Sequence, residues 1–344
     1  MQRRMITLTL ALLALVFGSS AALAQYQLTN LSSNQVKQAL HDDPLLVNGW
    51  GLVHGPNSPW WVSDNGSGWS TLYDGGGVLN KGLKVLIPTA GENGPGAPTG
   101  IVFNGSSDFQ LGGWPTFFLF AALDGSITGW APQSNFNQAI VATLVNAPKG
   151  ASYTGLAISN NATKNHLYAA DLANNTVDVY DGTFNMVMQL TASKVPAGFA
   201  PFGIQDINGL VYVTYASVSG GGGGYVVVFE EDGTPVNQGT PLISNGPLNQ
   251  PWGITLAPKN FGPLSNTILI SNNTNQGTIN GFNLQGQFVG FLKDTSGKAI
   301  RIDQLWGIAF GDGKGKNGAA NALYFAAGPN NNLAGSFGSI VFKP

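Results

Sequence analysis

The chain has 344 residues, of which only 9% are charged, and its formal net charge is −2 at pH 7. Soluble domains average roughly 25% charged residues, and so few cationic side chains disfavour a nucleic-acid surface, which needs clustered Lys and Arg. The absence of Cys excludes disulfides, thiolate metal sites and a Cys nucleophile.

The first 24 residues have the three-part pattern of a secretory signal peptide. Arg3 and Arg4 give a positive start, Met5–Phe17 is apolar, and Ala22-Leu23-Ala24 matches a small-x-small cleavage site. The apolar run is shorter than the ~20 residues that a membrane span needs. We predict cleavage after Ala24 and export of residues 25–344 to the periplasm or the cell exterior. No other stretch approaches a transmembrane length, so no membrane span is expected.

A short motif recurs through the rest of the chain: an aromatic or small residue, then Gly, then Ile or Leu. The motif glycines are Gly51, Gly100, Gly155, Gly203, Gly253 and Gly307. The intervals between them are 49, 55, 48, 50 and 54 residues, which is nearly even. Self-similarity at such a period is typical of repeat architectures.

Each motif is followed by two apolar runs that are rich in β-branched and aromatic residues and bounded by Gly, Asn, Asp or Pro, which predicts strands. The second runs are Trp60–Ser63, Phe117–Ala122, Leu167–Ala170, Leu210–Tyr215, Ile268–Ser271 and Leu323–Ala327. The third runs are Ser70–Tyr73, Ser126–Trp130, Thr176–Tyr180, Tyr225–Phe229, Thr278–Phe282 and Ser339–Phe342. Fourth strands are expected at Leu83–Ile87, Ile140–Val145, Val187–Leu190 and Phe288–Leu292, and the signal after Tyr225–Phe229 is weaker.

This repeat predicts a single all-β domain over residues 25–344, a six-bladed β-propeller of four-stranded blades. The last repeat ends at Pro344 directly after its third strand, whereas Tyr26–Leu31 has no blade of its own. We therefore predict that this N-terminal strand becomes the outer strand of the sixth blade. Such a closure removes the free sheet edges of the ring.

The motif glycines are expected where the six innermost strands converge, because Gly lets backbones approach closely. Four aromatic residues precede these glycines: Trp50, Phe202, Trp252 and Trp306. They are candidates for the axial channel, where they either pack between blades or contact a ligand.

The third repeat contains Leu167–Asp171 and Asn174–Asp181, which resemble the NHL repeat of six-bladed propellers. More of the chain resembles a family of uncharacterised exported bacterial proteins, some of which carry a C-terminal PEP-CTERM sorting tail. The segments that carry this resemblance are Trp61–Asn65, Pro98–Asn104, Pro196–Phe202, Leu248–Gly253 and Ala326–Asn330. It implies a propeller and export but brings no established activity, and this sequence lacks the sorting tail.

In each blade, the loop before the first strand and the loop between the second and third strands lie on the same face of the propeller. We call this face the upper face, and the opposite face the lower face. Polar candidates assigned to the upper face are Asp64, Asn65, Asp124, Asp171, Asn174 and Asn272. Oxygen-rich loops suit Ca²⁺, and Asp64, Asp171 and Asn272 are the candidate ligands. The alternative is that Asp and Asn stabilise turns.

The scarcity of titratable groups and the many Asn, Gly and aromatic residues in loops favour a non-catalytic binding or scaffold propeller of the cell envelope. Its upper face or axial channel would take a protein, peptide or glycan ligand, and no cofactor would be required. The alternative is a metal-assisted hydrolase or lyase of the lactonase or streptogramin-lyase sort, with a divalent cation as Lewis acid. That reading requires ligands from at least three blades, which Asp64, Asp171 and Asn272 could provide.

Overall fold

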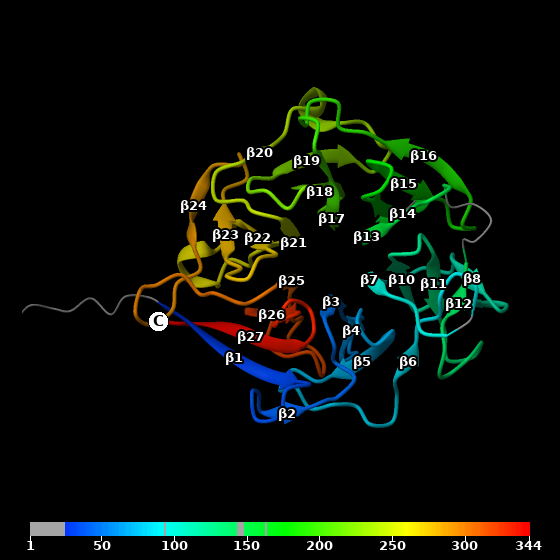
Figure 1. Cartoon of the computed structure of the whole chain (residues 1–344), viewed down its shortest axis with the longest axis horizontal. Coiled ribbons are helices and arrows are strands. Elements are labelled where there is room, and N and C mark those ends of the chain that lie inside the picture. The colour runs from blue at the N-terminus through cyan, green and yellow to red at the C-terminus, as the bar shows by residue number, and fades with distance from the viewer. Residues whose placement is uncertain (1–24, 93, 143–147, 162–163) are drawn as a thin grey trace, which may run out of the picture.

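The computed structural model describes residues 25–92, 94–142, 148–161 and 164–344, and its sheets are arranged around a central axis (Figure 1). The architecture is a six-bladed β-propeller, as predicted. The predicted signal peptide and the end of the predicted strand Ile140–Val145 lie outside the described residues.

The first three blades are antiparallel four-stranded sheets in simple up-and-down order. Blade 1 contains β3 (Gly49–Val53), β4 (Trp60–Asp64), β5 (Trp69–Tyr73) and β6 (Val85–Leu86). Blade 2 contains β7 (Pro98–Phe103), β10 (Phe118–Ala122), β11 (Ile127–Trp130) and β12 (Ile140–Val141). Blade 3 contains β13 (Tyr153–Asn161), β14 (Lys164–Asp171), β15 (Thr176–Tyr180) and β16 (Met186–Leu190).

Blades 4 and 5 have the same order, and blade 6 is completed from the other end of the chain. Blade 4 contains β17 (Phe199–Ile207), β18 (Leu210–Ser217), β19 (Tyr225–Glu230) and the short β20 (Ile243–Ser244), where the sequence signal was weak. Blade 5 contains β21 (Pro251–Leu256), β22 (Ile268–Asn272), β23 (Ile279–Phe282) and β24 (Phe288–Phe291). Blade 6 contains β25 (Leu305–Phe310), β26 (Ala322–Ala327) and β27 (Ser336–Lys343).

The ring closes as the sequence predicts, because the N-terminal strand β1 (Gln25–Ser33) pairs antiparallel with β27. Figure 1 shows the two strands side by side at the edge of the disc. The Tyr26 hydroxyl donates a hydrogen bond to the Phe261 carbonyl (2.7 Å), which ties this outer strand to blade 5. The two-residue β2 (His41–Asp42) extends the sheet by pairing parallel with β1, an addition that the sequence did not predict.

Three smaller elements complete the described structure. Blade 2 carries an inserted hairpin of β8 (Gln110–Leu111) and β9 (Trp114–Pro115). Two 3₁₀ turns, η1 (Val236–Gly239) and η2 (Gly262–Leu264), lie in blades 4 and 5. Among the described residues, no helix has the length and apolar character needed to cross a membrane.

The hydrophobic core is divided among the junctions between neighbouring blades. At the junction of blades 3 and 4, for example, Tyr168 and Val179 pack with Val211 and Val213. Comparable clusters of buried side chains fill the other five junctions. Because each blade presents apolar side chains on both faces, it depends on two neighbours to exclude water. The repeated β-branched and aromatic runs of the sequence therefore supply the apolar side chains that hold neighbouring blades together in a ring.

The motif glycines lie at the closest approach of neighbouring inner strands. A Cβ atom added to Gly51 would come within 2.5 Å of the Thr99 carbonyl oxygen in the next blade. The corresponding approach is 2.7 Å from Gly253 to the Trp306 oxygen and 2.8 Å from Gly307 to the Trp50 oxygen. Real Cβ atoms do not approach backbone this closely, so the predicted crowding at the axis is confirmed.

Candidate functional site: the axial cavity

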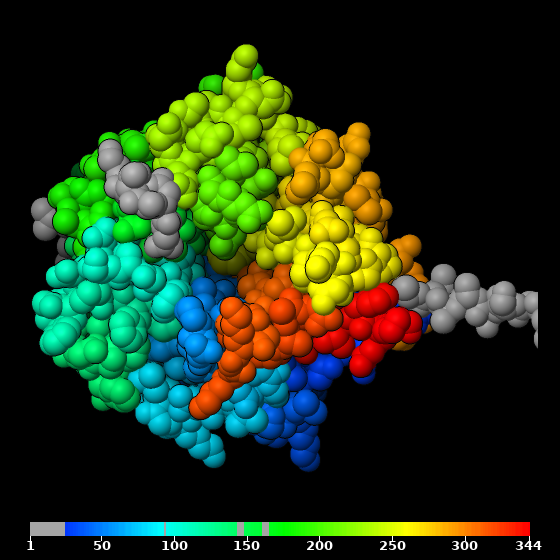
Figure 2. Space-filling view, turned by 180° about the vertical axis from the view of Figure 1, so that it is seen from behind, coloured from blue at the N-terminus to red at the C-terminus, as the bar shows by residue number. Residues whose placement is uncertain are grey.

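The axis of the disc holds a cavity of about 450 Å³ that is lined by the innermost strands of the blades. Its lining runs from the motif glycines toward the lower-face ends of these strands, at residues such as His54, Asn208 and Phe310. Figure 2, which shows the molecule from the side opposite to Figure 1, has a hollow at the centre of the disc. The cavity therefore opens on the lower face.

The upper end of the axis is closed by a cluster of aromatic rings, which we call the indole plug: Trp50, Trp252 and Trp306, with Phe202 packed against them. The rings of Trp50 and Trp306 are stacked with centroids 3.7 Å apart, and Trp252 meets Trp306 edge to face at 6.0 Å. All three indoles are more than nine-tenths buried. The plug blocks passage along the axis from the upper face.

Polar contacts fix two of the indoles. Trp306 Nε1 donates to Asn48 Oδ1 (2.9 Å), and Trp252 Nε1 donates to the Thr154 carbonyl (2.9 Å) in blade 3 across the axis. The buried Trp50 Nε1 has no partner in the described part of the chain. The aromatic candidates of the sequence analysis are thus brought together by the structure, and their packing interpretation accounts for the plug.

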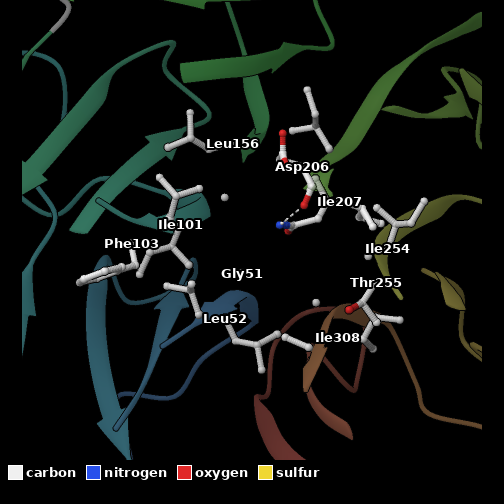
Figure 3. Close-up of a pocket in the computed structure, with 18 of the residues that line it drawn as sticks. Gly51, Leu52, Ile101, Phe103, Leu156, Asp206, Ile207, Ile254, Thr255 and Ile308 are labelled. Atoms are coloured by element: carbon white, nitrogen blue, oxygen red, sulfur yellow. Dashed lines mark hydrogen bonds between the residues drawn. The ribbon is translucent and has the colours of Figure 1, made fainter. Parts of the chain in front are cut away.

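Below the glycines, one aliphatic side chain from each blade forms what we call the aliphatic collar of the cavity. Its members are Leu52, Ile101, Leu156, Ile204, Ile254 and Ile308, the third residues of the six motifs. Figure 3 shows five of them, Leu52, Ile101, Leu156, Ile254 and Ile308, around the cavity. Since six equivalent positions are all Leu or Ile, the collar offers an apolar ring with no hydrogen-bonding group on its side chains.

The mouth of the cavity below the collar is more polar. Gln205 and Thr255 follow the collar residues of blades 4 and 5, and the Gln205 amide donates to the Asp206 carbonyl oxygen (3.2 Å; Figure 3). Burial and, to a smaller extent, the nearby Glu231 carboxyl raise the pKa of Asp206 to about 6. One carboxyl that titrates near neutrality therefore lies at the entrance.

His54 lies at the same mouth in blade 1. Its Nε2 is 3.1 Å from the Phe310 carbonyl oxygen, and its Nδ1 is 3.2 Å from the Gly55 carbonyl oxygen. The Asp312 carboxylate lies 4.0 Å from Nδ1, and both side chains are about four-fifths buried (18% and 20% exposed). The imidazole is thus held against backbone oxygens of blades 1 and 6, an arrangement that serves the junction between these blades.

Of the upper-face candidates, Asp64 is fully buried within blade 1 rather than exposed on a face. Thr71 donates a hydrogen bond to Asp64 Oδ2 (2.8 Å), and the Tyr73 hydroxyl donates to Asp43 Oδ2 (2.6 Å). Burial raises the pKa of the Asp64 carboxyl well above its usual range. This carboxyl is part of the interior of the blade.

Asp171 and Asn272 occupy the position equivalent to Asp64, at the end of the second strand of blades 3 and 5. Asp171 Oδ1 accepts from the backbone N–H of Ser152 (3.0 Å), and Asp171 Oδ2 accepts from Asn174 Nδ2 (2.7 Å). Asn272 Oδ1 accepts from the Asn249 N–H (3.0 Å). Each group is satisfied within its own blade, as expected for residues that stabilise turns.

Asn65 and Asp124 connect blades 1 and 2 at the upper face. Asn65 Nδ2 donates to the Pro98 carbonyl (3.1 Å), and Asp124 Oδ2 accepts from the Ala90 N–H (2.7 Å). Asn273 makes the equivalent contact in blade 5, with Nδ2 donating to the Leu305 carbonyl of blade 6 (3.4 Å). These side chains join blade 1 to blade 2 and blade 5 to blade 6.

The three candidate metal ligands do not converge, since Asp64, Asp171 and Asn272 each bond inside a different blade. Within the part of the chain that the structure describes, no three His, Asp or Glu side chains are grouped as a metal site would require. A role for these residues or for the plug in ligand binding stays a prediction.

Sequence reasoning missed the mouth residues Gln205, Asp206 and Thr255, which carry no motif. The aliphatic collar, in contrast, was visible as the third residue of every repeat. A second unpredicted feature is the left-handed backbone of Asn48, Gln250 and Gln304, each two residues before a plug tryptophan, with φ of +50°, +51° and +49°. The only sequence signal is the recurrence of an amide at this position in three repeats.

No family model matches the sequence. An uncharacterised protein of Acanthamoeba polyphaga mimivirus is 30% identical over 350 residues, covering 94% of this chain and 82% of that protein. The chain belongs to the same family as this uncharacterised mimivirus protein. A second uncharacterised mimivirus protein of the family is also 30% identical, over 94% of this chain and 88% of its own length. The predicted membership of an exported bacterial family stays a prediction.

Solved structures with the same fold include virginiamycin B lyase from Staphylococcus aureus, which is 14% identical with a TM-score of 0.57 and covers 92% of this chain and 99% of its own. A gluconolactonase from Xanthomonas campestris is 12% identical with a TM-score of 0.54, over 87% and 89% of the two chains. At these identities the likeness shows the propeller fold of this family member and no activity.

Proposed function

We propose that this protein is a non-catalytic binding propeller whose axial cavity takes an apolar group of its ligand from the lower face. The observation that carries the proposal is the aliphatic collar, in which six blades each contribute one Leu or Ile to a cavity closed above by the indole plug. A cavity of about 450 Å³ falls within the range of ligand pockets, roughly 300–1,000 Å³.

The ligand class that fits best among protein, peptide and glycan is a peptide segment, free or within a protein, that inserts an apolar side chain. Collar side chains offer dispersion and hydrophobic contacts but no hydrogen bonds, which suits a Leu or Phe side chain and disfavours sugar hydroxyls. The polar mouth at Gln205 and Thr255 then provides hydrogen bonds for the backbone of such a segment.

The proposal is tested by filling the cavity. Ala309 lines the cavity next to the collar and also packs against the core between blades 6 and 1. Ala309→Trp is therefore designed to reduce the space in the cavity, and an unchanged melting temperature is the check that the collar stays in place. We expect N-acetyl-leucine amide and N-acetyl-phenylalanine amide to show saturation-transfer NMR signals with the unmodified protein and to lose them in this variant. The matched control is Ala197→Trp, which places the same ring on an exposed upper-face loop. No transfer to either probe, or equal transfer in Ala309→Trp, would contradict the proposal.

The alternative function is a metal-assisted hydrolase or lyase, since the fold also occurs in a lyase and a gluconolactonase. It would require Ca²⁺ or a similar cation to draw ligands together that now bond within separate blades. Thermal melting with EDTA and then with excess Ca²⁺ separates the two readings. The binding proposal expects no shift, and a melting temperature that rises with Ca²⁺ would favour the alternative.

Export after cleavage at Ala24 is also part of the proposal. It is tested by N-terminal sequencing of the exported protein, whose first residue should be Gln25.

A further inference from the structure

A second groove lies on the upper face where blades 4, 5 and 6 meet, and its volume is about 460 Å³. Six of its lining residues have amide side chains: Asn249, Gln250, Asn273, Asn275, Gln276 and Gln304. The other two are a glycine and a threonine, so none of the eight described lining residues is charged or apolar. The charged Arg301 lies beside the groove, where its Nη1 donates to the Gln276 carbonyl (3.1 Å). The indole plug separates this groove from the axial cavity.

Three of the amides have their NH₂ groups engaged by the protein itself. Gln250 Nε2 donates to the carbonyl oxygens of Ser217 (3.1 Å) and Gly221 (3.0 Å). Gln304 Nε2 donates to Asn275 Oδ1 (2.6 Å), and Asn273 Nδ2 donates to the Leu305 carbonyl at 3.4 Å. The side-chain oxygens of Gln250, Asn273 and Gln304 accept no hydrogen bond from the described part of the chain. The groove therefore offers fixed acceptors and calls for a ligand rich in donors.

The backbone that presents these amides is held in a conformation that such residues rarely adopt. Gln250 and Gln304 have φ of +51° and +49°. Their carbonyl oxygens accept from the N–H groups of Asn273 and Gly328, both at 2.9 Å, which stabilises the left-handed turn. The equivalent Asn48 of blade 1 makes the same kind of carbonyl contact, with the Asn65 N–H (3.2 Å), but its side-chain Oδ1 accepts from Trp306 Nε1 of the plug. Among the described residues, this left-handed position supplies a side chain to the groove in blades 5 and 6, through Gln250 and Gln304. A strained backbone conformation of this kind persists only where the surrounding structure holds it in place.

We propose that this groove is a binding site for a neutral glycan. Sugar hydroxyls donate to amide oxygens and accept from amide N–H groups, and the uncharged lining gives no preference for an acidic or basic ligand. A peptide would be expected to need an apolar or aromatic anchor, which the lining does not have. Ca²⁺ prefers sites with carboxylates, and none lines the groove. Without a ring for sugar stacking, the affinity expected is weak, with Kd on the order of 1 mM.

The test uses maltohexaose, cellohexaose and chitohexaose as probes in saturation-transfer NMR and titration with the full chain. At least one should bind, and Gln276→Ala should weaken it by about fivefold, the loss expected for one hydrogen-bonding side chain. Gln276 is exposed, so the substitution leaves the fold intact. The matched control is Gln285→Ala, an exposed amide on a lower-face turn of the same blade.

Two results would overturn the glycan site: no binding of any of the three oligosaccharides at 10-fold the expected Kd, or equal weakening by Gln276→Ala and Gln285→Ala. The cavity-filling variant Ala309→Trp should leave oligosaccharide binding unchanged. The glycan site and the axial cavity can therefore fail independently of one another.

Discussion

The three residues of each motif have separate physical roles along the axis. The glycine permits the close approach of inner strands, as Gly51 shows against the Thr99 oxygen, and this crowding could be predicted from the repeat. The Ile or Leu after it forms the collar. Whether Trp50, Trp252 and Trp306 would face a ligand or one another could not be predicted, because it depends on distances between blades that no local pattern encodes.

The polar candidates show the same limit at single residues. Asp64, Asp171 and Asn272 are the last residues of β4, β14 and β22. Their burial depends on partners from loops far along the chain, such as Asp43 beside Tyr73. The sequence could locate these side chains on a face but could not distinguish a binding group from one that stabilises a turn.

Asp64 leads to a prediction about pH. Because burial raises the pKa of this carboxyl in the folded state above its unfolded value, folding is favoured by its protonated form. Stability from this group is therefore fully present below the unfolded pKa, which is about 4, and is lost as pH rises from there toward the folded pKa. Asp64→Asn keeps the shape of the protonated carboxyl and removes the titration. We expect the melting temperature of the variant, relative to the unmodified protein, to increase by a few degrees from pH 5 to pH 8.

The difference in melting temperature between Asp64→Asn and the unmodified protein isolates the effect of Asp64. Asp178 and Asp206, whose pKa values are also raised, titrate in both proteins and cancel in this difference. The same holds for exposed carboxyls with lowered pKa values, such as Asp232. A melting difference that stays constant from pH 5 to pH 8 would show that Asp64 is ionised in the folded protein.

At the scale of elements, the joining of β1 to β27 is what turns six repeats into a closed ring. The segment 25–48 precedes the first inner strand, β3, and the sequence predicted that Tyr26–Leu31 within it would close the ring, because one blade lacked its outer strand. The added β2 and the β8–β9 hairpin were not predicted, since two-residue strands leave no periodic signal.

Removal of residues 25–33 should leave β27 as an open edge and expose the surface that Tyr26 and Leu31 cover. We expect the shortened chain to melt about 10 °C or more below the full chain and to associate, because an unpaired edge strand templates pairing. A synthetic peptide of the sequence 25–33, added to the shortened chain, should restore the melting temperature.

The control for this complementation is a scrambled peptide of the same composition, which should have no effect. If the shortened chain melts at the temperature of the full chain, β1 contributes nothing to the closure of the ring. Equal rescue by the two peptides would show that pairing with β27 lacks the observed register.

At the scale of the whole molecule, the fold makes two faces with different chemistry. Six inter-blade cores set the disc, the indole plug closes the axis above, and the aliphatic collar lies below it. The sequence predicted the disc and placed the polar candidates on its upper face. It did not predict that the axial cavity opens on the lower face, because side-chain packing at the centre decides which end is closed.

This division of the disc separates two modes of recognition. The lower cavity is apolar at its collar, whereas the upper groove of blades 4 to 6 presents only amides, a hydroxyl and backbone. Under the two proposals, ligands of different chemistry bind to opposite faces. A scaffold that holds two partners apart is a natural use of such an arrangement, and it follows from the two proposals above.

The most direct test of the account is a crystal structure of the protein pressurised with xenon, which binds apolar cavities. We predict xenon density on the axis, within contact distance of collar residues such as Leu156, Ile204 and Ile308, below an ordered indole plug. An axis without xenon at the collar, or a cavity that opens past Trp50 and Trp306 to the upper face, would contradict the account.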